Sequence, residues 1–211
     1  GAFAEEICIS ENKVTKIPEE MDFITAASMS LTYGTSAYAL FQRANIQKND
    51  FILIHGATGG VGITALEISK AIGAKIIATA STSEKLNIAK EYGADYCINY
   101  SDNEFKDKFK EITNGKGANI IYDPVGGDVF SQSLRCIAWD GRILVIGFAS
   151  GTIASAPTNL PLLKNCSIVG VFWGAWRERD PNGHNENMKT ILKWWKEKII
   201  KPKVSKIFNL E

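Results

Sequence analysis

Apolar residues follow two different periods along this chain. Short runs rich in β-branched and aromatic residues alternate with segments in which apolar residues recur every three or four positions. Runs of the first kind predict buried strands, and segments of the second kind predict amphipathic helices. Six strands are expected, at Phe51–His55, Lys75–Ala80, Tyr96–Asn99, Asn119–Tyr122, Arg142–Phe148 and Ser167–Phe172.

The expected helices lie between these strands, with connections short enough for right-handed crossovers. Such alternation predicts an α/β fold with a parallel sheet that helices cover on both faces. We expect a doubly wound six-stranded Rossmann sheet in the order 3-2-1-4-5-6, with its ligand crevice at the carboxyl ends of the strands. The helices are expected at Gly60–Ile72, Glu84–Tyr92, Glu104–Thr113 and Val129–Ala138.

Local sequence signals support these boundaries. Ser81-x-x-Glu84 and Ser101-x-x-Glu104 have the spacing of capping boxes. Three glycines follow the helices as stop signals, because glycine adopts the left-handed conformation that commonly ends a helix. They are Gly73, Gly93 and Gly115.

A further amphipathic helix is expected near the C-terminal end, at 184–198. Its apolar stripe consists of Met188, Ile191, Leu192, Trp195 and Ile199, and core packing is the first interpretation. Trp194 lies off this stripe. Together with Trp176, it is a candidate for contact with a neighbouring domain.

The turn after the first strand carries the main functional signal. Its glycines follow the pattern Ala57-x-Gly59-x-x-Gly62, directly before an expected helix. Glycine lets the backbone approach a ligand closely, and the free N–H groups of a helix N-terminus favour an anion. This indicates a pyrophosphate site, although a glycine-rich turn that only packs helix on sheet is the structural alternative.

The end of the second strand bears on which dinucleotide would bind. An NAD site normally has Asp or Glu there, whereas this chain has Ser81 and Thr82, followed by Lys85. Hydroxyl groups and a positive charge suit a 2′-phosphate, so NADPH is favoured over NADH. A capped helix with an exposed lysine is the alternative.

Composition excludes several other classes of protein. The 211 residues include 24 basic and 23 acidic side chains, so the net charge of +1 gives no case for nucleic acid or an anionic membrane. No run reaches the ~20 apolar residues of a spanning helix, and we expect a soluble, cytosolic protein. The four cysteines and two histidines are scattered, and neither a disulfide nor a metal site is expected.

The two histidines have structural interpretations. His55 ends the first strand, where we expect backbone hydrogen bonds to satisfy its ring beside the cofactor. His184 lies in a sequence typical of a turn, and we expect a solvated turn residue or a helix-start group.

Five sequence blocks together resemble a known family. In order and spacing they are similar to the zinc-independent, zeta-crystallin-like quinone oxidoreductases of the medium-chain dehydrogenase/reductase superfamily. That branch also has alanine in place of the first glycine of the dinucleotide-binding pattern, as this chain has at Ala57. The blocks are 56–62, 92–95, 98–100, 122–127 and 141–147.

The resemblance implies a set of NADPH-binding residues. Gly59, Gly60, Val61 and Gly62 would hold the pyrophosphate; Ser81, Lys85 and Tyr100 would lie by the 2′-phosphate. Thr35 would lie near the nicotinamide, with Phe148, Ser150, Phe172 and Trp173 lining that end. Plain core packing is the alternative for Phe148 and Phe172.

The resemblance also implies neighbouring structure. Residues 1–20 would be the tail of a substrate-side domain related to the chaperonin-10 fold, 21–200 the Rossmann domain, and 201–211 the return to the first domain. We expect the chain to be a fragment of a larger enzyme and to be inactive or weakly active by itself. A homodimer joined at the edge of the sixth strand is also implied.

The implied reaction is hydride transfer from NADPH to a quinone or another conjugated carbonyl. The sequence assigns no catalytic residue: Asp123 is interpreted as shaping a loop instead of acting as a base. Tyr33 and Tyr38 are interpreted as packing in the core or against the cofactor, with a hydroxyl near the substrate as the alternative. Two alternatives stay open. One is a nucleotide-binding module without turnover of its own, and the other is an enoyl or alkenal double-bond reductase of the same superfamily.

Overall fold

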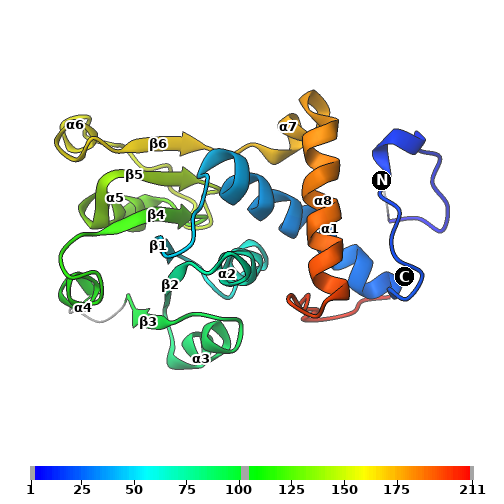
Figure 1. Ribbon diagram of the computed structural model, residues 1–211, viewed down its shortest axis with the longest axis horizontal. Coiled ribbons are helices and arrows are strands. Elements are labelled where there is room, and N and C mark those ends of the chain that lie inside the picture. Colours follow the sequence, from blue (N-terminus) through cyan, green and yellow to red (C-terminus); the bar gives the residue numbers. More distant parts are fainter. Residues whose placement is uncertain (1–2, 101–104, 210–211) are drawn as a thin grey trace.

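All six expected strands are present in one parallel sheet. The computed structural model of the protein describes residues 3–100 and 105–209. The strand order is β3-β2-β1-β4-β5-β6, which confirms the doubly wound arrangement (Figure 1). The strands are β1 (Phe51–Ile54), β2 (Lys75–Ala80), β3 (Tyr96–Asn99), β4 (Ala118–Asp123), β5 (Ile137–Val145) and β6 (Ser167–Gly170).

Helices cover both faces of this sheet, because side chains alternate between the faces along each strand. On β1, Ile52 and Ile54 join one buried cluster with residues of α1, α2 and α8, whereas Leu53 joins a second cluster with residues of α4 and α5. The helices are α1 (Phe23–Ala37), α2 (Gly60–Ile72), α3 (Ser83–Glu91), α4 (Phe105–Ile112), α5 (Gly127–Cys136), α6 (Asn159–Lys164), α7 (Trp173–Arg179) and α8 (Pro181–Lys196).

Several elements differ from the sequence expectation. The helix α1, the π-helical turn Tyr38–Arg43 that continues it, and the short helices α6 and α7 were not predicted. The strand β5 begins earlier than expected, because Ile137 already pairs with Ala118 before the register shifts. It ends at Val145, so Phe148 lies beyond the strand.

Helix termini follow the expected chemistry, with one correction. The glycines Gly73, Gly93 and Gly115 have φ of +88°, +110° and +74°, as the stop signals predicted. The N-cap of α3 is Thr82 instead of Ser81, because the Thr82 side chain accepts the Lys85 N–H. The second expected capping box, Ser101-x-x-Glu104, lies outside the described residues.

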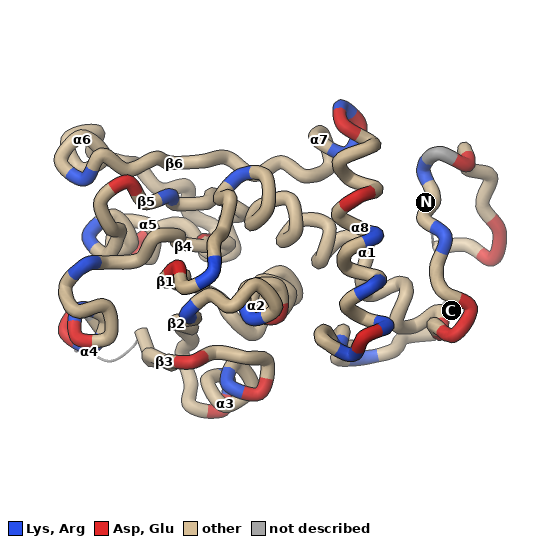
Figure 2. The backbone as a smooth tube through the Cα atoms, in the orientation of Figure 1, with Lys and Arg blue, Asp and Glu red and all other residues tan. Residues whose placement is uncertain are grey.

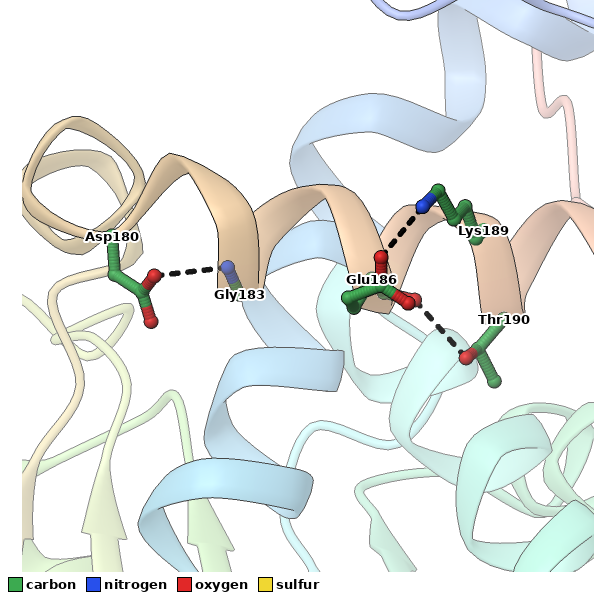
Figure 3. A network of polar contacts seen from close by, with 5 residues as sticks. All are labelled: Asp180, Gly183, Glu186, Lys189 and Thr190. Atoms are coloured by element: carbon green, nitrogen blue, oxygen red, sulfur yellow. Dashed lines mark hydrogen bonds and ion pairs between the residues drawn. The ribbon is translucent and has the colours of Figure 1, made fainter.

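The helix α8 begins three residues before the expected start. Asp180 is its N-cap and accepts the Gly183 N–H at 2.9 Å, and one turn further Glu186 pairs with Lys189 at 2.6 Å (Figure 3). The helix ends at Lys196, so Ile199 is not on its stripe and is 48% exposed. His184 consequently lies inside the first turns of α8, where it is buried.

Positively and negatively charged residues are interspersed along the backbone (Figure 2). Within the described residues, no helix combines the length and apolar character that crossing a bilayer demands.

Candidate functional site

The glycine turn joins β1 to α2 as the sequence predicted. His55 and Gly56 follow the strand, and Gly59 caps the helix without a side-chain hydrogen bond. The first hydrogen bond of the helix runs from the Ile63 N–H to the Gly59 carbonyl. Helix geometry leaves the N–H groups of the first turn, at 60–62, without intrahelical partners. This turn therefore presents backbone donors at the carboxyl edge of the sheet, where an anion is favoured.

Gly62 is required by close packing of the backbone. A Cβ at this position would lie 2.3 Å from the Gly56 carbonyl oxygen and 2.8 Å from the Ala57 Cα. The turn thus folds tightly against the first turn of α2, and no side chain fits between them. Gly59 and Gly60 are both exposed, so this backbone is open to a ligand.

The helix α1 supports the same turn from one side. The Ser36 hydroxyl lies 2.8 Å from the Thr64 hydroxyl of α2, 2.8 Å from the Tyr122 hydroxyl of β4, and 3.1 Å from the Val61 carbonyl. Burial raises the pKa of Tyr122 above its usual range, so its hydroxyl stays protonated in this network. The network fixes α1 against the glycine turn, and the preceding residue, Thr35, is half-buried on the same helix.

His55 lies beneath the turn and is sealed inside the fold. Its Nδ1 lies 2.8 Å from the Thr79 hydroxyl and its Nε2 lies 2.8 Å from the Ser133 hydroxyl. The expectation of backbone partners was therefore wrong, since two side-chain hydroxyls satisfy the ring. Burial lowers the pKa of His55 to about 4, against a smaller opposing effect of Asp123.

The ends of β2 and β3 bring two sequence-predicted residues to one place. Tyr100 follows β3, and its N–H donates to the Ala80 carbonyl at the end of β2, next to Ser81. Ser81 is half-buried, whereas the side chains of Lys85 and Tyr100 are exposed. Ser81 and Tyr100 thus lie next to each other at the carboxyl end of β2, and Lys85 follows in the first turn of α3.

The ends of β5 and β6 carry the other predicted residues. Phe148 and Phe172 are 48% and 75% exposed, so the alternative of plain core packing was wrong for both. The Ser150 hydroxyl accepts the Thr152 N–H within an exposed loop. Trp173 differs from these three residues, because it is 8% exposed and packs against Gly34 of α1.

Three other side chains have the structural roles that the sequence suggested. Asp123 Oδ1 accepts the N–H groups of Val125 and Gly126 at 2.8 and 2.9 Å, which shapes the loop after β4. Tyr33 is buried, and Tyr38 stacks on Trp176 with ring centroids 4.3 Å apart. The described residues contain no group of three or more His, Cys, Asp or Glu side chains placed to hold a metal.

Sequence reasoning missed the supporting residues. Ser36 and Thr64 are buried hydroxyl residues within helices, and Glu67 is a buried acid in α2. A polar residue on the apolar face of a helix is the available signal for such roles, because a buried polar group needs a partner. The two tryptophans suggested for a neighbouring domain pack internally: Trp194 packs edge-on against Phe41, and Trp176 contacts His184.

These features define a Rossmann-type dinucleotide-binding domain, and the comparisons with known proteins specify its family. The family model described as zinc-binding dehydrogenase matches residues 60–194. The chain therefore belongs to this family, and its relatives confirm the quinone oxidoreductase branch that the five blocks predicted. A quinone oxidoreductase-like protein 2 homolog from Nematostella vectensis is 42% identical over all of this chain and 58% of its own length.

Solved structures agree with this assignment. Escherichia coli quinone oxidoreductase complexed with NADPH superposes with a TM-score of 0.81 and 29% identity, over 92% of this chain and 60% of that protein. The CurK enoyl reductase superposes with a TM-score of 0.84 and 26% identity, over 95% of this chain and 59% of that protein. The chain thus spans less than two thirds of the length of these relatives.

Proposed function

We propose that this chain is the NADPH-binding part of an oxidoreductase that reduces a quinone or another conjugated carbonyl. The observation that carries the proposal is the glycine turn, where Gly62 leaves no room for a side chain and the first turn of α2 presents free N–H groups. A pyrophosphate fits such a turn. The NADPH complex of the Escherichia coli relative supports the choice of cofactor.

Each part of the site has a place in this proposal. The backbone of Gly59, Gly60, Val61 and Gly62 would hold the pyrophosphate, and Ser81, Lys85 and Tyr100 would contact the 2′-phosphate. Thr35, Phe148, Ser150 and Phe172 would line the nicotinamide end. Trp173 would contribute by packing against α1 beneath that end, because its ring is largely buried.

The chemistry that NADPH supplies when bound is a hydride from C4 of its nicotinamide. In this proposal the chain's own residues bind and orient NADPH, and we assign none of them to proton transfer. His55 is bonded to Thr79 and Ser133, and Asp123 is bonded to the loop after β4, so both are committed to the fold.

Two other functions compete with this one. The likeness to the CurK enoyl reductase favours reduction of an activated carbon–carbon double bond at the same site. The second competing function is that of a nucleotide-binding module without turnover, because the chain spans only part of the length of its relatives. Oxidation of NADPH when a simple quinone is added to the chain would exclude the module without turnover, and oxidation with an enoyl thioester alone would favour double-bond reduction.

A homodimer through the free edge of β6 is part of the proposal. The strand is the last of the sheet, and Ile168 on it is 40% exposed. An uncovered edge strand favours pairing with another strand.

The cofactor proposal is tested by comparing the affinities of NADPH and NADH by calorimetry. Lys85→Ala should weaken NADPH binding about tenfold and leave NADH binding unchanged, because one charge-assisted contact to a phosphate is lost. Lys90→Ala, on the same helix α3 and also exposed, is the matched control and should change neither affinity. Binding of neither nucleotide would refute the proposal, and equal weakening by both substitutions would remove Lys85 from the site.

A further inference from the structure

A cavity lies away from the glycine turn. It has a volume of about 520 Å³ and lies between α1, α7, α8 and residues 13–17. None of the residues predicted to bind NADPH lines it. A volume of this size is typical of small-molecule sites, which have apolar walls and a few convergent polar groups.

Apolar side chains that can adapt their shape form one part of the wall of this cavity. Met21, Met29 and Met188 line it, and all three are buried. Methionine side chains are unbranched and polarizable, so they fit apolar molecules of varied shape. Leu192 and Ile17 extend the same surface. The body of a ligand at this place would therefore be apolar.

One wall carries a buried histidine that the proposed reaction does not use. His184 lines the cavity and is 7% exposed, and its ring packs edge-on against Trp173 and Trp176, with centroids 5.6 and 6.5 Å away. Within the described residues, Nδ1 is sealed from solvent without a hydrogen-bond partner. Nε2 is thus the ring nitrogen that a ligand in the cavity can reach.

The charged groups at the cavity favour an anion. Lys13 and Arg177 line it together with a single acid, Glu178. Arg177 lies over the Trp173 ring, 5.2 Å from its centroid, and takes part in no ion pair among the described residues. Burial and the charge of Arg177 lower the pKa of His184, so its ring is neutral at neutral pH and has one N–H to donate.

We propose that this cavity binds an amphipathic carboxylate. The apolar body would lie on Met21, Met29 and Met188, and the carboxylate would accept hydrogen bonds from Arg177 and from Nε2 of His184. Planar guanidinium groups are well suited to carboxylates. This site does not depend on nucleotide binding, and failure of either proposal leaves the other standing.

Octanoate is a suitable probe, and 1-octanol is its uncharged counterpart of equal length. The chain is titrated with each while tryptophan fluorescence is followed, because Trp173 and Trp176 both flank His184. We expect a saturable change with octanoate and binding of octanol that is at least about tenfold weaker, as the loss of a charged contact implies.

Variants assign the response to this cavity. Arg177→Gln should weaken octanoate binding about tenfold, whereas Lys85→Gln, at the proposed nucleotide site, should leave it unchanged. Ser30→Phe fills the cavity from an exposed position on α1 and should abolish binding, with the fold checked by circular dichroism.

Three results would overturn the proposal. They are the absence of a saturable response to octanoate, equal affinities for octanoate and octanol, and equal effects of Arg177→Gln and Lys85→Gln. If Arg177→Gln or Ser30→Phe does not fold, the remaining variant still tests the proposal, since weaker binding of octanoate is expected for each of them.

Discussion

The Tyr33 hydroxyl donates a 2.5 Å hydrogen bond to Oε2 of Glu67, so a buried carboxyl group joins α1 to α2. The other oxygen, Oε1, accepts the Lys201 N–H at 2.6 Å, which adds the segment after α8 to the same junction. Burial raises the pKa of Glu67, although both hydrogen bonds oppose this shift. The structure therefore keeps an ionisable group where three segments meet behind the glycine turn.

Replacing this carboxyl group should change how stability depends on pH. Because the folded pKa of Glu67 is raised above 4.5, the unfolded chain loses its proton first, and this group stabilises the fold less as pH rises above 4.5. The free energy of unfolding of Glu67→Gln, relative to the unsubstituted chain, should therefore increase with pH. Urea unfolding between pH 4.5 and 8 measures the difference.

A surface acid provides the control for that experiment. Glu186→Gln removes a carboxylate from the exposed side of α8, where it pairs with Lys189. Its stability difference should vary much less over the same range. A pH-independent difference for Glu67→Gln would contradict the burial argument.

The buried His55 should give the opposite dependence of stability on pH. The folded pKa of His55 is about 4, below its ordinary value of 6.5, so the unfolded chain binds the proton first as pH falls. The stabilisation from neutral His55 is present above pH 6.5 and is lost toward pH 4.

His55→Gln separates this effect from other acid-sensitive groups. At pH 7.5 the variant should be less stable by about 1–3 kcal/mol, because at least one buried hydroxyl loses its partner. Near pH 4 the gap should close or reverse. Chemical unfolding at the two pH values measures the difference in free energy of unfolding between the variant and the unsubstituted chain. If acid destabilises both to the same extent, His55 does not cause the loss of stability.

Much of the fold followed from local signals. The glycine turn and the bounds of α2 were predicted because a glycine pattern and a left-handed glycine mark them within a few residues. The bounds of α3 were predicted to within one residue, although its N-cap is Thr82 instead of Ser81. The strand order followed from the alternation of strands and helices. The helix α1 was missed although Met29, Tyr33 and Ala37 have helical spacing and are buried. Small and hydroxyl residues between them weaken the apolar period, and burial of α1 depends on α2 and α8.

Parts of the candidate site depend on distant contacts that no local pattern contains. Trp173 is buried because Gly34, far away in the sequence, gives its indole room: a Cβ there would lie 2.7 Å from the ring. His184 was expected to be a solvated turn residue or a helix-start group, but it is buried against two tryptophans. Partners of this kind become visible only when the helices are placed in space.

The glycine turn should tolerate no added methyl group. Gly62→Ala places its Cβ against backbone atoms of Gly56 and Ala57, which cannot move aside without reshaping the turn. We expect a loss of more than about 2 kcal/mol in the free energy of unfolding, as for other overpacked sites. If the chain binds NADPH as proposed, binding should be lost as well.

Gly170→Ala is the matched control for this substitution. A Cβ at Gly170 would meet no atom within 4 Å, so the stability should change by less than about 0.5 kcal/mol. Thermal unfolding and calorimetric titration of the two variants test both effects. Equal stabilities of the two variants would mean that the turn can relax around Gly62.

The proposed dimer predicts a specific effect at the sheet edge. Ile168 pairs with Ile143 on one side only, because β6 is the last strand, and its side chain is 40% exposed. In a two-fold contact through this edge, Ile168→Lys would bring two like charges together across the interface. Sedimentation equilibrium should therefore find a dimer for the unsubstituted chain and a monomer for the variant.

Phe23→Lys places the same charge on α1, where Phe23 is 85% exposed, and should leave the dimer intact. A monomeric unsubstituted chain, or equal masses for both variants, would show that this edge does not join two copies.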